Sequence, residues 1–278
     1  MKKTWRIVLP ALLVGSFISF ADTKDKREIN DKAVTEEICP CEMEGMDLEE
    51  AYNRSMANAG VSQQVSKETP KYLNPNIPIE ERIDDLLPRL TLEEKVIQLS
   101  DSWGSKGIAR LKIPAMLKTE GLHGQSYATG STIFPHGINM GSTFDTELIQ
   151  EVGKATAIEA KAANLRVSWS PVLDVARDAR WGRVEETYGE DPYLVGRIGV
   201  AWIKGFQGEH MFACPKHFAG HGQPVGGRDS HDYGLSDRVM RNIHLAPFRD
   251  VIKEANAFGV MAAYGLWNGV PDNGSKEL

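Results

Sequence analysis

Short apolar runs alternate with longer amphipathic stretches through most of the chain. Runs as long as a buried strand predict strands at residues 115–118, 137–140, 166–169, 211–214 and 258–261. Apolar residues at helical spacing predict helices over residues 145–163, 192–206 and 236–255. Strands that alternate with helices are typical of βαβ units and a parallel sheet. The pattern therefore predicts an α/β domain, although periodicity alone does not separate a barrel from an open doubly wound sheet.

Ahead of this alternation, residues 79–99 carry apolar side chains at helical spacing, and Pro88 interrupts them. Thr91 precedes Glu94 by three residues, which is the spacing of a capping box. We therefore expect a helix to begin directly after Thr91.

Polar side chains follow several of the predicted strands, at Glu120, Asp174, Lys216 and Tyr264. In a parallel barrel, the carboxyl ends of the strands lie on one face, and active sites are built there. The order of strands and polar residues thus predicts one functional face that gathers residues distant in sequence.

The N-terminus has the pattern of a secretory signal. Lys2 and Lys3 precede an apolar run over residues 7–20, and Ala21 offers a small residue at the cleavage position. This run is shorter than the roughly 20 residues that span a bilayer. We expect residues 1–21 to be a signal peptide, residues 22–71 to be a polar linker or arm, and the protein to be periplasmic or secreted without a stable membrane anchor.

Composition and charge narrow the possible partners. The chain has 278 residues, of which 41% are hydrophobic and 25% charged, and its net charge is −6. An acidic chain without a basic cluster does not favour nucleic acid as a partner. Cys39, Cys41 and Cys214 do not form a disulfide framework, and nothing in the sequence calls for a cofactor.

Two segments concentrate side chains that bind sugars. Residues 177–191 contain several arginines and carboxylates around Trp181, and residues 216–231 combine a lysine, three histidines and Arg228. Arginine and lysine donate hydrogen bonds to hydroxyls, carboxylates accept them, and tryptophan offers an apolar face to a pyranose ring. His217, His221 and His231 also permit a zinc site, but the glycines among them disfavour the helix that this spacing would need, so we predict no metal.

The chain resembles the N-terminal barrel domain of glycoside hydrolase family 3, the family of β-glucosidases and β-xylosidases. The resemblance begins near Tyr72 and continues to the end. Its motifs are Leu-Glu-Glu-Lys-Val-Ile-Gln-Leu at 92–99, Thr-Glu-Gly-Leu-His-Gly at 119–124, Ile-Phe-Pro at 133–135, Ser-Pro-Val-Leu-Asp-Val-Ala-Arg-Asp at 170–178, Trp-Gly-Arg at 181–183, Lys-His-Phe at 216–218, Met-Ala-Ala-Tyr at 261–264 and Asn-Gly-Val-Pro at 268–271. The resemblance implies that residues 72–278 form part of a TIM-type (β/α)8 barrel, C-terminally incomplete because five predicted strands fall short of eight.

The resemblance also implies which residues hold the sugar. The expected substrate-binding residues are Glu120, Arg183, Lys216, His217, Arg228 and Tyr264, the last beneath the reacting ring. Many β-glucosidases have Asp where this chain has Glu120. The longer side chain resembles the xylosidase-like branch and leaves the choice between glucose and xylose open. Glu186 is expected to orient Arg183, although a plain surface ion pair is an alternative. Asp174 as a turn cap, and Trp181 and Tyr264 as packing residues, also stay open.

The family resemblance implies a retaining β-glycosidase that acts on β-linked oligosaccharides or aryl glycosides through two carboxyl groups. The family's Asp nucleophile lies in a Ser-Asp-Trp-like motif after the Asn-Gly-x-Pro segment, and its acid/base Glu comes from a following α/β sandwich domain. Ser-Asp-Ser-Trp at 100–103 has the wrong spacing for that motif. We therefore expect a fragment that lacks both groups and the sandwich domain, with no catalytic residue of its own and no turnover alone.

Two other functions remain open from the sequence. The β-N-acetylglucosaminidase branch uses an Asp–His pair, which Asp229 and His231 resemble. A non-catalytic carbohydrate-binding protein is the second alternative. Gly265 stands where Asn usually follows the tyrosine of the family motif, and it removes a side-chain amide from that position.

Overall fold

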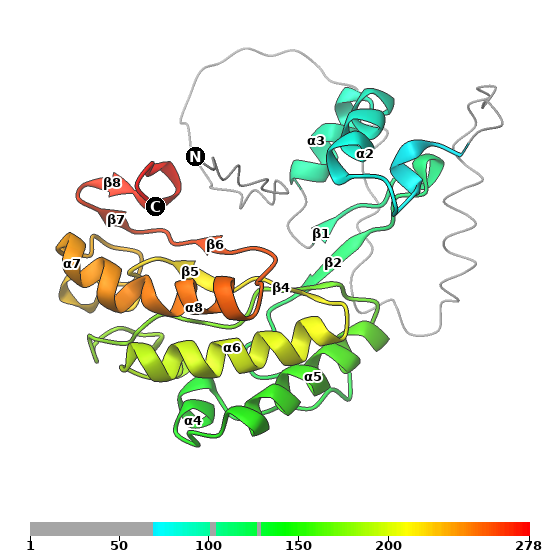
Figure 1. The fold of residues 1–278 in the computed structure, drawn as a ribbon. Coiled ribbons are helices and arrows are strands. Elements are labelled where there is room, and N and C mark those ends of the chain that lie inside the picture. Colours follow the sequence, from blue (N-terminus) through cyan, green and yellow to red (C-terminus); the bar gives the residue numbers. More distant parts are fainter. Residues whose placement is uncertain (1–68, 101–103, 127–128) are drawn as a thin grey trace, which may run out of the picture. The chain divides into compact units, whose positions relative to one another are not determined.

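The computed structural model describes residues 69–100, 104–126 and 129–278 (Figure 1). The predicted signal peptide and nearly all of the predicted polar arm lie outside these residues. The described chain falls into two compact units: a small unit that ends at Ala115 and a large unit from Met116 to Leu278. No helix among the described residues is long and apolar enough to cross a membrane.

The small unit is mainly helical. Its elements are η2 (Lys71–Leu73), α2 (Ile79–Leu86), η3 (Leu87–Arg89), α3 (Leu92–Ser100), β1 (Gly104–Ser105) and η4 (Ala109–Leu111). Tyr72, Ile108 and Leu111 form its buried centre, and the Tyr72 hydroxyl donates to the Leu111 carbonyl at 2.8 Å. The capping box at the start of α3 is confirmed, since the Glu94 amide donates to Thr91 Oγ1 and the Thr91 amide donates to Glu94 Oε2.

The large unit is built on short parallel strands that neighbour one another in chain order. They are β2 (Met116–Thr119), β3 (Val167–Ser168), β4 (Phe212–Ala213), β5 (Lys216–Phe218) and β6 (Met261–Ala262). β3 pairs in parallel with both β2 and β4, and β5 pairs in parallel with β6. A further parallel bridge joins Val172 to Lys216, so the segment after β3 continues beside β5. The predicted strands at 115–118, 166–169 and 211–214 are confirmed, and the last predicted strand begins later, at Met261.

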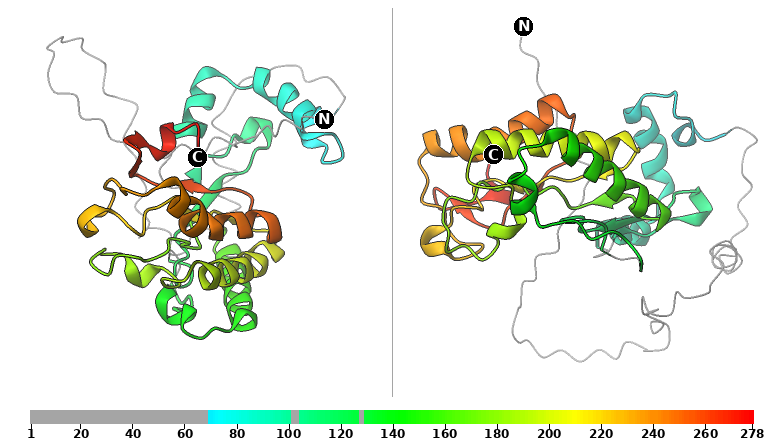
Figure 2. Two further views of the ribbon diagram at one scale, coloured as in Figure 1. Left: turned by 60° about the vertical axis from the view of Figure 1, so that its left-hand side comes forward. Right: turned by 90° about the horizontal axis from the view of Figure 1, so that it is seen from below.

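Three helices of the large unit lie side by side on one face of these strands (Figures 1 and 2). They are α5 (Thr146–Ala162), α6 (Pro192–Gly208) and α8 (Ala246–Glu254). Asp145 and Asp191 cap the first two, because their carboxylates accept the amides of Leu148 and Leu194. The helix predicted over residues 236–255 is divided, since α7 (Asp237–Val239) runs into a π-helical turn, η7 (Met240–His244), before α8 begins.

The prediction of a strand at residues 137–140 is wrong, because this segment forms the short helix α4 (Gly137–Gly141). A four-residue apolar run is too short for periodicity to separate helix from strand. Gly137 and Gly141 lie one turn apart, and a Cβ on either would overlap the backbone of Glu186 or Tyr188. Tertiary contact with the segment that carries Glu186 therefore decides the conformation of α4.

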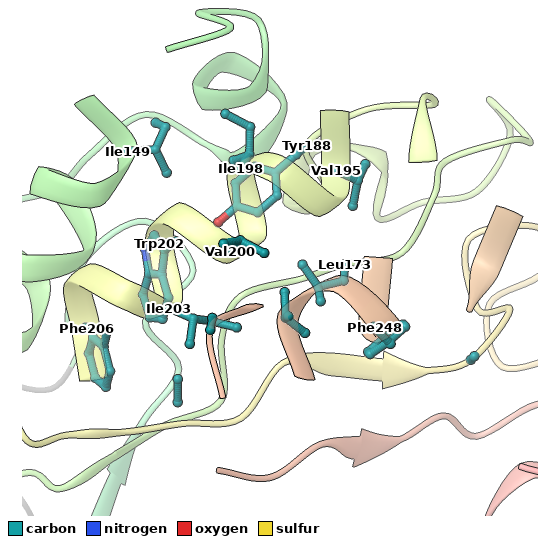
Figure 3. Close-up of a cluster of buried hydrophobic side chains, with 14 of the residues drawn as sticks. Ile149, Leu173, Tyr188, Val195, Ile198, Val200, Trp202, Ile203, Phe206 and Phe248 are labelled. Carbon is teal, nitrogen blue, oxygen red and sulfur yellow. The ribbon is translucent and has the colours of Figure 1, made fainter. Parts of the chain in front are cut away.

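The main core lies around α6. Figure 3 shows its buried side chains next to Ile149 of α5 on one side and Leu173 and Phe248 on the other. The rings of Trp202 and Phe206 stack with their centroids 4.8 Å apart. The predicted α/β class is confirmed, and the described strands do not close into a barrel.

A hairpin ends the large unit. β7 (Leu266–Trp267) pairs with β8 (Val270–Pro271), and the turn residues Asn268 and Gly269 both have positive φ, as a two-residue Asn-Gly hairpin turn requires. The short helix η8 (Asp272–Gly274) follows. The Tyr233 hydroxyl donates to Asp272 Oδ2 at 2.7 Å and accepts from the Gly265 amide. A Cβ at position 265 would overlap the Tyr233 ring, so this contact explains the glycine there.

Close packing of α5 on α6 predicts that Gly205→Ala is destabilising. A Cβ at Gly205 would overlap the backbone of Gln150, and overpacking of this kind costs about 1–3 kcal/mol of unfolding free energy. In the described part of the chain, no heavy atom lies within 4 Å of the Cβ position at Gly208 on the same helix, so Gly208→Ala is the matched control. Urea unfolding followed by circular dichroism should show a lower unfolding free energy than the wild type for Gly205→Ala only. Equal midpoints for the two variants would contradict this packing.

The Asp272 carboxyl predicts a pH-dependent stability. Burial raises its pKa to about 7, although the hydrogen bond from Tyr233 opposes the shift. Asp272 Oδ1 has no hydrogen-bond partner among the residues that the structure describes. The folded-state pKa lies above the unfolded value, so protonation of Asp272 contributes to the free energy of unfolding. This contribution is complete below about pH 4 and is lost as the pH rises through about 7. Asp272→Asn should therefore become more stable relative to the wild type as the pH rises over that range. Urea midpoints of both proteins at several pH values measure this, and a constant difference between them would refute it.

Candidate functional site

The candidate site gathers side chains from the segments that follow β2 and β3 and from β5. Glu120 comes directly after β2, Asp174 and Arg183 lie between β3 and α6, and Lys216 and His217 lie on β5 itself. The sequence analysis places Lys216 after a strand, whereas Lys216 is the first residue of β5. The parallel pairing of these segments brings residues almost a hundred positions apart into contact.

Lys216 and Glu120 form the first ion pair of the cluster. Lys216 Nζ donates to Glu120 Oε2 at 2.8 Å. The lysine side chain is only 5% exposed, whereas that of Glu120 is 34% exposed. A buried ammonium group needs a partner, so Glu120 is held by Lys216 while part of its carboxylate still faces solvent.

Asp174 orients His217. Its carboxylate lies 2.7 Å from His217 Nδ1 and also accepts the His217 backbone amide at 3.4 Å. Burial works against the charge of Asp174, but His217, His221 and Arg183 together outweigh it, and the pKa of Asp174 lies below its ordinary value. The charged carboxylate accepts from Nδ1 of His217, so it holds a proton on that nitrogen and fixes the orientation of the ring.

Arg183 connects both histidines to Glu186. Its Nε and Nη2 donate to the two oxygens of Glu186 at 2.9 and 2.8 Å. Nη2 also lies 3.3 Å from His217 Nε2, and Nη1 lies 3.2 Å from His221 Nε2. This two-pronged, partly buried pair is the orienting contact that the sequence predicted, and it is not a plain surface ion pair.

His221, Asp229 and Trp181 extend the cluster. Trp181 Nε1 donates to Asp229 Oδ1 at 2.7 Å, and His221 Nε2 lies 3.1 Å from the same oxygen. Trp181 and His221 are both buried, and their rings meet edge to face. Burial opposes the charge of Asp229, but Trp181, His221, Ser230 and Arg183 together outweigh it and hold the pKa of Asp229 below its ordinary value. Trp181 is thus a packing residue with one polar contact.

The structure brings four of the six predicted sugar-binding residues together: Glu120, Arg183, Lys216 and His217. Arg228 is exposed, and no hydrogen bond or ion pair joins it to a described residue. Tyr264 is 52% exposed, so the alternative that it is buried in the core is wrong. These two side chains are available to a ligand but are not part of the hydrogen-bonded cluster.

Sequence reasoning undervalued Asp174 and His221. Asp174 was more readily explained as a turn cap, yet it is fully buried against His217. From the sequence, His221 belongs to the histidine-containing sugar-binding segment and permits a metal site; in the structure its contacts are Arg183, Asp229 and the two neighbouring rings. The sequence signal for their roles is the number of charged residues near each of them. A charged side chain in an apolar, buried segment needs a partner of opposite charge or a hydrogen-bonding group.

The Asp–His pair of the alternative hypothesis is not formed in this structure. Asp229 contacts Trp181, His221 and Ser230, whereas His231 is exposed and makes no described hydrogen bond to Asp229. Ser230 between them has positive φ, which turns the chain at this point.

Among the described residues, no three His, Cys, Asp or Glu side chains are arranged to hold a metal ion. Burial raises the pKa of the Cys214 thiol to about 11, so this thiol is an unreactive part of the core. A hollow lined by Thr146, Gln150, Arg197 and Lys204 contains none of the clustered residues, so it is not the candidate site.

The arrangement can bind a polyhydroxylated ligand. Lysine and guanidinium donors, a partly exposed carboxylate acceptor and an exposed tyrosine ring occur on neighbouring segments, and this is the mixture that recognises sugar hydroxyls and ring faces.

Comparison with known proteins decides the family. The model for the N-terminal domain of glycosyl hydrolase family 3 matches residues 91–278. The chain belongs to glycosyl hydrolase family 3. A β-xylosidase of Formosa agariphila is 38% identical to it over 211 residues, which cover 71% of this chain and 29% of that protein. A β-glucosidase of Kluyveromyces marxianus is 37% identical over 203 residues, which cover 70% of this chain and 24% of that protein.

Solved structures of β-glucosidases agree with the described fold. The crystal structure of the Kluyveromyces marxianus β-glucosidase superposes with a TM-score of 0.64 at 37% identity and covers 70% of this chain and 24% of that one. A β-glucosidase of Erythrobacter marinus superposes with a TM-score of 0.66 at 31% identity and covers 73% of this chain and 34% of that one. The chain therefore spans about a quarter to a third of the relatives that it matches.

The buried Asp174–His217 pair predicts a destabilising effect of Asp174→Asn. An amide in place of the carboxylate cannot accept from both the ring and the backbone of His217, so a buried donor is left unpaired at a cost of about 1–3 kcal/mol. Because the pKa of Asp174 is depressed in the folded state, this stabilisation is present above about pH 4 and is lost as the pH falls through the folded value.

Urea unfolding at neutral and acidic pH measures both effects. The variant should be less stable than the wild type at neutral pH, and the difference should shrink in acid. Asp178→Asn is the control, since Asp178 lies on the same segment and pairs with the exposed Arg180 instead of a buried histidine. Equal decreases in unfolding free energy for the two variants would contradict a stabilising hydrogen bond between Asp174 and His217.

Proposed function

We propose that this chain is the N-terminal, sugar-binding part of an exported retaining β-glycosidase that acts on β-xylosides or β-glucosides. The observation that carries the proposal is the Glu120–Lys216 ion pair, together with the contacts of Arg183. These residues lie within the part of the chain that matches the family 3 N-terminal domain. Export is supported by the signal-like pattern of residues 1–21.

The strand arrangement supports part of a TIM-type barrel as the scaffold. The paired strands between β2 and β6 are parallel and follow chain order, and α5, α6 and α8 lie on one face of them. A doubly wound sheet would reverse its strand order and place helices on both faces. Successive βα units with helices on one face are the repeating element of a (β/α)8 barrel.

Sugar binding fits the exposure of the clustered groups. Glu120 keeps one carboxylate oxygen without a described partner, because Lys216 bonds only Oε2. Nη1 of Arg183 has His221 as its single described partner, so guanidinium N–H groups remain for a ligand. A partly exposed acceptor and donor, each held in place by buried partners, provide the preorganised contacts that ligand binding requires.

Recognition, rather than bond cleavage, is the role we assign to the clustered carboxylates. Each is already held by a cation or donor: Glu120 by Lys216, Asp174 by His217, Glu186 by Arg183 and Asp229 by Trp181. A retaining mechanism needs one carboxylate free to attack carbon and a second carboxyl group to transfer a proton. In the proposed enzyme, those two groups come from outside this cluster.

A β-xyloside is the substrate class we favour. Three of the relatives, two from Formosa agariphila and one from Xylanibacter ruminicola, are named β-xylosidase, putative β-xylosidase and xylan 1,4-β-xylosidase. Glu120 reaches one methylene further than Asp would, and xylose lacks the hydroxymethyl group of glucose. β-Glucosides remain the second choice, because other relatives are named β-glucosidases and one of those was solved in complex with glucose.

The proposal predicts that Glu120→Gln weakens sugar binding about 10- to 100-fold. The substitution keeps an acceptor for Lys216 but removes the charge, and a hydrogen bond to a charged group is worth about 1.5–3 kcal/mol. Titration calorimetry of the purified protein with xylose and with glucose measures the affinities. Glu185→Gln is the matched control, because Glu185 is exposed on the neighbouring η5 helix (Val184–Glu186).

Two results would overturn the proposal. One is a wild-type protein that binds neither sugar. The other is equal weakening by Glu120→Gln and Glu185→Gln, which would place the sugar away from Glu120. Tighter binding of glucose than of xylose would reverse the substrate preference and leave the family-level function intact.

A further inference from the structure

Two serine hydroxyls meet at the backbone carbonyl of Glu120. Ser170 Oγ donates to the Glu120 carbonyl oxygen at 2.6 Å, and Ser168 Oγ donates to the same oxygen at 3.3 Å. Both serines are fully buried. A carbonyl oxygen has two lone pairs, so it accepts both donors, and the shorter bond from Ser170 is the stronger of the two. Buried side chains therefore hold the backbone at Glu120.

The sequence of the segment after β3 explains why serines take this place. The Trp169 amide donates to the Thr119 carbonyl at 2.9 Å, which is the last backbone bond from this segment to β2. The next donor of a regular parallel ladder would be the amide of residue 171, but Pro171 has no N–H. Side chains two residues apart on an extended segment lie on the same side. The hydroxyls of Ser168 and Ser170 thus supply together the donors that the backbone lacks.

The chain turns directly after Glu120, and the turn leaves no room for a side chain at the next position. Gly121 has a φ of 68°, in the left-handed region that favours glycine. A Cβ at Gly121 would overlap Ser168 Oγ. The glycine and the two serines are therefore parts of one arrangement that fixes the path of the backbone where Glu120 leaves the strand.

The same segment also holds the ion-pair partner of Glu120. The Lys216 amide donates to the Pro171 carbonyl at 3.0 Å, and the Leu173 amide donates to the Lys216 carbonyl at 2.7 Å. Among the described strands, β2 pairs with β1 and β3 and β5 pairs with β6, so no strand pairing joins β2 to β5. Residues 168–173 are therefore the connection that sets the backbone of Glu120 against that of Lys216.

We propose that Ser170, assisted by Ser168, is a positioning residue of the candidate site: its hydroxyl fixes the backbone at Glu120 so that the carboxylate bonds Lys216 and keeps its second oxygen for a ligand. The inference deepens the proposed function and rests on it for the identity of the ligand as a sugar. Because Ser170 is buried, it acts through Glu120 and makes no contact with the sugar itself.

The test compares three serine-to-alanine variants in the full chain. Ser170→Ala removes the shorter bond to the Glu120 carbonyl, and Ser168→Ala removes the longer one. Ser142→Ala is the matched control, because the exposed Ser142 hydroxyl also donates to a backbone carbonyl, that of Asn139 at 2.7 Å. Urea unfolding establishes that each variant is folded, and titration calorimetry with xylose measures affinity.

Xylose affinity should fall about tenfold in Ser170→Ala and about threefold in Ser168→Ala, and it should stay unchanged in Ser142→Ala. Unchanged affinity in a folded Ser170→Ala variant would overturn the inference. If Ser170→Ala does not fold, Ser168→Ala decides: a threefold loss supports the inference, and unchanged affinity refutes it.

A second comparison separates positioning of Glu120 from a general loosening of the fold. Effects on binding that act through one group are not additive. In the Glu120→Gln background, Ser170→Ala should therefore lower xylose affinity by less than about twofold. A tenfold loss in both backgrounds would show that Ser170 acts independently of the Glu120 carboxylate, and this would contradict the positioning role.

Failure of the proposed function has a different signature. In that case the wild type binds neither xylose nor glucose, and the crystal structure of ligand-free Ser170→Ala decides the inference. A Glu120 carboxylate that has moved away from Lys216 supports the positioning role without a sugar. A Glu120–Lys216 contact that is unchanged in the variant refutes it.

Discussion

The guanidinium group of Arg183 is the point on which the candidate site depends. It contacts Glu186 on its own segment and the two histidines of the segment that begins at β5. Each of those histidines is backed by a carboxylate, Asp174 or Asp229, so the positive charge sits within an ordered set of acceptors. Removing any one partner leaves a buried polar group unpaired, and this interdependence makes the cluster a rigid unit rather than a set of separate ion pairs.

The scaffold explains how such a cluster can form from distant parts of the chain. Parallel strands in chain order place the ends of successive βα units beside one another, and the bridge between Val172 and Lys216 aligns the two segments that matter most. Close backbone contacts then fix the loops: Gly137 and Gly141 let α4 pack on the segment just beyond Arg183. A similar close backbone contact occurs between α5 and α6, where Gly205 allows the two helices to pack together.

Much of this organisation was predictable from the sequence, and the failures have physical causes. The long helices and three of the strands followed from apolar spacing, and the capping box at Thr91 followed from a local motif. The run at residues 137–140 was mistaken for a strand because tertiary packing, not periodicity, decides its conformation. Motifs identified Glu120 and Arg183, but the partners of His221 depend on the path of the loop around Ser230, which no local pattern encodes.

A crystal structure of the protein soaked with xylose tests the central claim most directly. The account predicts a pyranose whose hydroxyls lie within hydrogen-bonding distance of Glu120, Lys216 and Nη1 of Arg183, with Glu186 and both histidines in their ligand-free positions. A sugar bound elsewhere, or an Arg183 that leaves Glu186 to reach the sugar, would contradict the claim that the buried partners preorganise this site.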